Sequence, residues 1–152
     1  MAATESGPIR LTVQASVQAT ENAEKVKKAI ENLFPADLRS TLKFNKTNLQ
    51  GHYHNPILRL ETQLSQRDRI ERTLASIGQS LSSGDRAQLA RTFSSRIDEK
   101  GGLFIRFDKQ EAYEGRIRII HRGDSIRMVI RFSGRKPSVN QLEHHCRQFQ
   151  LI

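Results

Sequence analysis

The sequence predicts an α+β domain built as a two-layer sandwich, with a mostly antiparallel sheet and helices on one face. Two observations predict this class. Apolar residues alternate with polar ones in several short runs, which is typical of strands that bury one face and expose the other. Between these runs, apolar residues recur at the spacing of amphipathic helices. The resulting order, β-α-β-β-α-α-β-β-β-α, leaves the second face of the sheet open.

The first half of the chain contains an expected strand, a helix and a hairpin. Residues 9–18 alternate between apolar and polar side chains over their whole length. A helical stripe then runs from Ala23 to Phe34, and Pro35 ends it because proline cannot continue a helix. Residues 40–64 contain two alternating runs separated by a glycine and a proline, which predicts a long hairpin.

The second half adds two helices, three strands and a last helix. Two helical stripes in residues 65–97 follow Ser65 and Ser82, which we expect to cap them. Three strands are expected within residues 103–132, with an Arg-Gly-Asp-Ser turn before the last one. A C-terminal helix should begin after Ser138.

The length of 152 residues suits one domain with a core of its own. Residues 1–8 show no periodicity, so we expect a disordered N-terminus there and a single domain over residues 9–152. The formal net charge is +9, which points to a polyanionic partner, although a basic charge can also serve solubility alone. We favour the polyanion because the charge falls on strands and not in a tail.

The basic residues gather on one side of the expected strands between Leu103 and Lys136. This segment holds nine lysines and arginines against four acids. Arginine suits phosphate because its planar fork donates two parallel hydrogen bonds, and it can also stack on bases. Strand alternation predicts that five guanidinium groups share the polar face: Arg106, Arg116, Arg118, Arg127 and Arg131. The alternative is a solvated face whose arginines pair with Glu61 and other nearby acids.

Several residues near these strands are further candidates for RNA contacts. Lys109 would hold a phosphate, and Gln110 a base edge or a sugar hydroxyl, unless both serve the fold where a strand ends. Tyr53 or Tyr113 could stack an unpaired base. His52 lies in a polar loop beside Tyr53 and could also contact RNA.

Other classes of protein find little support in the sequence. The pair His52 and His54 lacks a third metal ligand nearby, so we expect no metal site and no cofactor. No triad, phosphate-cradling glycine loop or carboxylate pair indicates an enzyme, and a nuclease would need carboxylates that only the fold could bring together. No apolar run reaches the length of a membrane span, and the single Cys146 excludes an internal disulfide framework. We therefore expect a cytoplasmic protein.

Three sequence blocks stand out: Ala-Thr-Glu-Asn at residues 19–22 with Glu-Lys-Val at 24–26, Gly-His-Tyr with Asn-Pro-Ile in residues 51–57, and residues 106–115, which include Asp-Lys-Gln-x-Ala-Tyr-x-Gly. They resemble an archaeal family of small RNA-binding-domain proteins described as predicted exosome subunits. The resemblance extends from about Leu11 to Phe132, and its most specific part is the Asp-Lys-Gln-x-Ala-Tyr-x-Gly block. The resemblance implies a fold like ferredoxin-like sandwiches and a ribosomal protein of the large subunit, and it implies RNA binding. His54 departs from the glycine usual in that family.

Together these observations predict a non-enzymatic RNA-binding protein of RNA processing, either exosome-related or ribosome-related. RNA is the expected partner, alone or within a ribonucleoprotein or exosome assembly, and no membrane is involved. The alternative is an interaction module that docks on a multisubunit assembly or forms a homodimer through its open sheet.

The single cysteine gives the first testable prediction. Cys146 falls on the apolar stripe of the C-terminal helix, so its thiol should be buried and unreactive in the native protein. A chromogenic thiol reagent should label it slowly in buffer and rapidly in denaturant. Rapid labelling of the folded protein would contradict this placement.

Overall fold

The structure, a computed structural model, describes residues 7–50, 56–134 and 137–152. In chain order its elements are β1 (Pro8–Val17), α2 (Ala23–Glu31), η1 (Ala36–Thr41), β2 (Phe44–Gln50), β3 (Pro56–Leu64), α3 (Arg67–Ser80), α4 (Ser83–Arg91), η3 (Phe93–Arg96), β4 (Leu103–Asp108), α5 (Lys109–Tyr113), β5 (Ser125–Phe132) and α6 (Val139–Gln148).

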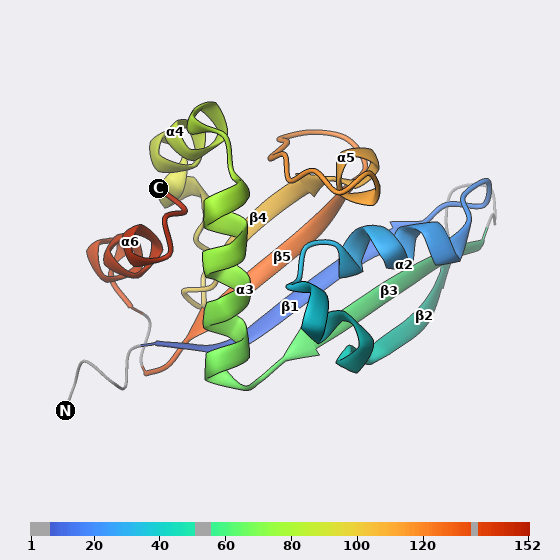
Figure 1. The fold of residues 1–152 in the computed structure, drawn as a ribbon, viewed down its shortest axis with the longest axis horizontal. Coiled ribbons are helices and arrows are strands. Elements are labelled where there is room, and N and C mark those ends of the chain that lie inside the picture. Colours follow the sequence, from blue (N-terminus) through green and yellow to red (C-terminus); the bar gives the residue numbers. More distant parts are fainter. Residues whose placement is uncertain (1–6, 51–55, 135–136) are drawn as a thin grey trace.

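The first strand of the chain occupies the centre of the sheet. The strand order is β2-β3-β1-β5-β4, and every neighbouring pair is antiparallel. In this register Val13 of β1 lies opposite Thr62 of β3 on one side and Met128 of β5 on the other. Figure 1 shows the five strands of the described residues as one twisted sheet, with β1 between β3 and β5.

Strands β1, β3, β4 and β5 bury the same face of the sheet, whereas in β2 only Phe44 is partly buried and residues 45–49 are exposed. In β1 the alternating buried residues are Leu11, Val13, Ala15 and Val17, and the same phase continues across the ladder into β3, β5 and β4. Helices α2 and α3 lie across this face, and α4 and α6 lie beside α3 (Figure 1). The buried apolar side chains of sheet and helices form one cluster. The predicted two-layer α+β sandwich is therefore confirmed.

Of the three strands expected within residues 103–132, the middle one, marked by Ile117 and Ile119, is absent from the sheet, and that prediction was wrong. After β4 the chain turns into the short helix α5, where the Asp108 carboxylate accepts a hydrogen bond from the Glu111 amide at 2.8 Å. Ile119 makes only an isolated bridge with Phe107. Its side chain is buried, so two spaced isoleucines in an irregular segment imitated the alternation of a strand.

The ends of several elements also test the sequence predictions. Ser82 caps α4 and Ser138 forms a capping box at α6, as predicted. Ser65 does not cap α3, which begins at Arg67 after Gln66 and has no side-chain cap. The first strand begins at Pro8, one residue earlier than predicted, whereas residues 1–6 of the expected disordered N-terminus lie outside the described residues.

Cys146 is fully buried in α6, as predicted. Burial, with a smaller contribution from the Glu143 carboxylate, raises the pKa of its thiol to about 12. Its low reactivity stays a prediction. Among the described residues, no helix has both the length and the apolar character that a membrane crossing requires.

Gly78 sets the distance between α3 and the C-terminal segment. A Cβ atom at this buried position would lie 1.9 Å from the carbonyl oxygen of Phe149. The Gly78 carbonyl also accepts a hydrogen bond from Arg86 Nη2 at 2.8 Å. The close approach of the two backbones therefore needs a residue without a side chain.

Replacing Gly78 with Ala should destabilise the fold by about 1–3 kcal/mol, because the C-terminal segment must move away from α3. The matched control is Gly84→Ala in α4, where the nearest atom to an added Cβ is 3.9 Å away. That variant should keep its stability or gain up to about 1 kcal/mol from helix propensity. Urea unfolding measures both, and equal stabilities of the two variants would contradict the packing argument.

Candidate nucleic-acid interface

Three arginines stand together on the sheet face that the helices leave uncovered. Arg106 of β4 lies opposite Arg127 of β5, and Arg127 lies opposite Gln14 of β1. Arg59 of β3 lies opposite Ser16, two residues along β1. We call this group, Arg59, Arg106 and Arg127 together with Phe104, the arginine face.

The three guanidinium groups lack acidic partners. Among the described residues, none of the three forms an ion pair or a hydrogen bond. The Nε atoms of Arg59 and Arg127 are buried and have no hydrogen-bond partner. The three arginines line a hollow of about 190 Å³ whose other walls come from Gln14, Ala15, Ser16 and Ser125. The walls of this hollow therefore carry no negative charge.

Glu61 is the acid that could have neutralised this face. Glu61 belongs to β3, two residues after Arg59, and lies opposite Gln14 of β1. No ion pair joins it to an arginine within the described part of the chain. The alternative in which Glu61 neutralises the arginines is not what the structure shows.

Phe104 gives the arginine face an aromatic surface. Its ring centroid lies 5.3 Å from the guanidinium carbon of Arg127 and 6.0 Å from that of Arg106. Both arginines are therefore within cation–π distance of the same partly exposed ring. Guanidinium groups next to an aromatic ring are the combination that holds the phosphates and bases of single strands.

The other three arginines predicted for this face are neutralised. Arg131 lies on the open side of β5, but its Nη2 forms an ion pair with Asp98 at 3.1 Å. Arg116 and Arg118 lie outside the strands, so their predicted position on the sheet face was wrong. Arg116 pairs with Glu111 and Glu114, and Arg118 pairs with Asp85 of α4 at 3.3 Å.

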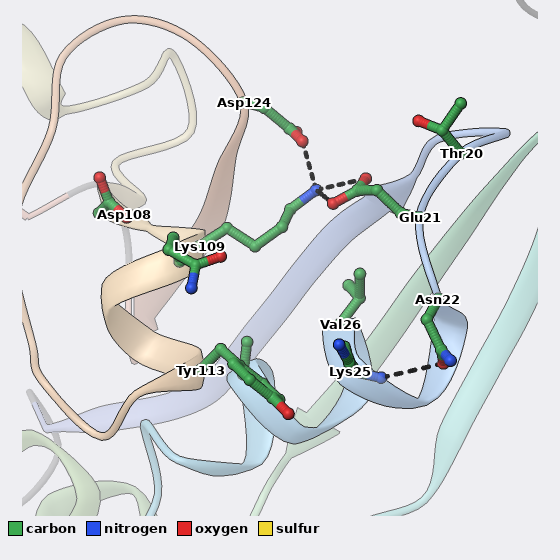
Figure 2. A pocket seen from close by; sticks show the side chains of 11 residues that line it. Thr20, Glu21, Asn22, Lys25, Val26, Asp108, Lys109, Tyr113 and Asp124 are labelled. Atoms are coloured by element: carbon green, nitrogen blue, oxygen red, sulfur yellow. Dashed lines mark hydrogen bonds and ion pairs between the residues drawn. The ribbon is translucent and has the colours of Figure 1, made fainter.

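Lys109 holds three segments together. Its Nζ donates to the Ser16 carbonyl at 2.7 Å and to Glu21 at 3.1 Å, and it also bonds Asp124. Figure 2 shows its side chain reaching from the start of α5 toward both carboxylates. An ammonium has three donors, and these contacts use them, so the structure favours the structural role over a phosphate contact.

A second hollow of about 580 Å³ lies beside Lys109. Tyr113 and Lys25 face each other there, with the Lys25 ammonium 5.7 Å from the tyrosine ring centroid (Figure 2). Gln110 is exposed at its rim and donates to Glu114 at 3.1 Å. Tyr113 and Gln110 thus line this second hollow and not the hollow of the arginine face. His52 and Tyr53 lie outside the described residues.

Two arginines near the face did not enter the predicted contacts. Arg59 alternates with Leu58 and Leu60, and this signal already placed it on the polar side of its strand. What the sequence did not show is that β3 lies next to β1 and close to β5. Arg96, at the end of η3, gave no signal, because its neighbours follow a helical stripe.

Replacing Lys109 with Met should lower the free energy of unfolding by about 1–3 kcal/mol, because the Ser16 carbonyl and both acids lose their donor. RNA affinity should change less than about twofold if the role is structural. Gln110→Ala is the matched control at an exposed position, with an expected stability change below about 0.5 kcal/mol. Urea unfolding gives the stabilities, and a K109M protein as stable as the parent would refute the role of this contact.

Comparisons of the sequence with known proteins identify its family. A family model described as RNA binding matches residues 10–132. RNA-binding protein PAB1135 of Pyrococcus abyssi is 32% identical over 122 residues, which cover 80% of this chain and 79% of the relative.

Solved structures of similar proteins have the same fold. A protein of Archaeglobus fulgidus superimposes with a TM-score of 0.80 at 30% identity, covering 93% of this chain and 99% of its own. A protein of Methanothermobacter thermautotrophicus reaches 0.75 at 25% identity, with 94% and 98% covered. On the family match and these relatives, the chain belongs to the protein family described as RNA binding.

Proposed function

We propose that this protein binds single-stranded RNA without catalysing a reaction on it, and that the arginine face is the contact surface. The observation that carries the proposal is the group of three guanidinium groups that line one hollow without acidic partners among the described residues, two of them beside the Phe104 ring. Family membership supports RNA as the ligand, and a relative carries the name RNA-binding protein.

The physical argument concerns charge and shape. Arg59, Arg106 and Arg127 provide fork-shaped donors for phosphate oxygens, at little cost because no existing ion pair has to break. Phe104 provides an apolar ring on which an unpaired base can stack. An open sheet accepts an extended strand, whereas a double helix hides its bases from such a ring.

The cellular role is a separate proposal that rests on the family resemblance. We propose a place in RNA processing, as part of or next to an exosome or ribosome-related assembly. A cytoplasmic location is part of the same proposal, and it agrees with the lack of a membrane-spanning helix among the described residues.

The arginine face predicts how affinity responds to substitution and salt. Replacing Arg106 and Arg127 with Ala should weaken binding to single-stranded RNA by about 1.5 kcal/mol for each lost contact, or roughly tenfold each. The slope of log affinity against log salt should fall by about 0.7 for each contact. Fluorescence anisotropy with several RNA sequences measures both quantities.

The matched control removes the same charge from the helix layer. Lys28→Ala with Arg91→Ala changes two exposed cations on α2 and α4, and RNA affinity should stay within about threefold of the parent. Unchanged affinity in a folded Arg106/Arg127 variant would exclude this face. Binding of a protein partner that hardly depends on salt would then favour the interaction module.

A further inference from the structure

Arg96 is a buried cation without an anion. Only 4% of the residue is exposed. Its Nε donates to Thr92 Oγ1 at 2.8 Å, and its Nη2 lies 3.4 Å from His121 Nδ1, so neither partner carries a negative charge. No carboxylate among the described residues forms an ion pair with it. Burial, and then repulsion from Arg106, lowers the pKa of Arg96.

A small hollow opens beside this guanidinium at the outer edge of β4. It measures about 140 Å³ and is lined by Arg96, Phe104, Arg106, Ile120 and His121, with Thr92 and Ser95. We call it the edge pocket. It shares Arg106 and Phe104 with the arginine face, so the two sites are continuous.

The edge pocket presents donors to a ligand. The hydroxyls of Thr92 and Ser95 already donate to backbone carbonyls at 2.9 and 2.7 Å. Arginine can only donate, so His121 Nδ1 is the acceptor toward Arg96 and the ring carries its proton on Nε2. The groups left for a ligand are thus two guanidinium groups and one imidazole N–H. This set fits an oxyanion and repels a cation.

We propose that the edge pocket binds the terminal phosphate of an RNA strand whose body lies on the arginine face. The inference rests on the proposed function and assigns a specific part of the RNA to this place. A terminal phosphate carries a charge of about −1.5 to −2 and three free oxygens, which match two guanidinium groups and an imidazole. An internal phosphate carries a single charge and continues into sugar on both sides.

Size favours the same ligand. Pockets that enclose drug-sized molecules measure about 300–1,000 Å³, and the edge pocket is smaller than these. It can hold a phosphate group but not a whole nucleotide. The terminal base would lie outside, where the Phe104 ring is available to stack on it.

The experiment compares RNAs of one sequence and length that differ only at their ends. Fluorescence anisotropy measures affinity for strands with a 5′-phosphate, with a 3′-phosphate and with hydroxyls at both ends. One of the two phosphorylated strands, the 5′ or the 3′ form, should bind about tenfold tighter than the hydroxyl-ended strand. The Arg96→Gln variant should lose this preference and keep its affinity for the hydroxyl-ended strand.

Two further variants make the test specific. Arg91→Gln removes an exposed cation of α4 close in sequence, and it should keep the preference for the phosphorylated end. His121→Ala changes an exposed side chain and should reduce the preference about threefold, which keeps the test available if Arg96→Gln does not fold. Inorganic phosphate, titrated as a competitor, should remove the preference for the phosphorylated strand before it weakens binding of the hydroxyl-ended strand.

Each outcome decides the proposal. Equal affinities for all three strands would overturn the end-binding inference and leave RNA binding by the arginine face intact. No binding of any strand would overturn both. Inorganic phosphate that stabilises the parent but not Arg96→Gln, together with equal RNA affinities, would identify a site for free phosphate and overturn the RNA-end assignment.

Discussion

The common phase of the strands is the constraint on which both surfaces of the sheet depend. Arg127 and Met128 are neighbours on β5, so one faces the open side and the other the core. A slip of one residue would exchange them and bury a guanidinium without a partner, at a cost of several kcal/mol. Because β1 pairs on both sides, its register also fixes those of β3 and β5. The core and the arginine face therefore specify each other.

Local pattern explains what the sequence predicted, and non-local pairing explains what it did not. Alternation placed Arg106, Arg127 and Arg131 on the polar side of their strands because that period is a property of the extended backbone. Strand order depends on which distant segments meet, so the approach of Arg59 to Arg127 had no sequence signal. Alternation also misled at Ile117 and Ile119, since a three-residue run cannot separate a strand from an irregular segment with two partly or fully buried side chains.

Pairing, more than net charge, distinguishes the cations that we propose to bind RNA from those that are held in ion pairs. Arg116, Arg118 and Lys109 come from the most basic stretch of sequence, yet each forms an ion pair with a carboxylate that lies next to it in the fold. The arginine face and Arg96 lack such partners within the described residues. Surface ion pairs contribute only about 0–1 kcal/mol, so a pair on an exposed arginine says less about stability than about whether that cation can meet a ligand.

The central position of β1 in the sheet affects how the chain folds during its synthesis. Leu11 pairs with Leu64 in β3 and with Ile130 in β5, so one edge of the strand stays unpaired until β5, more than 100 residues later, has been synthesised. Until then the nascent chain exposes an apolar strand edge, the kind of surface that chaperones cover and that aggregates. Pairing across such long sequence separations also slows folding. A chain whose synthesis stops before β5 would therefore leave one edge of β1 unpaired and β4 without a neighbouring strand.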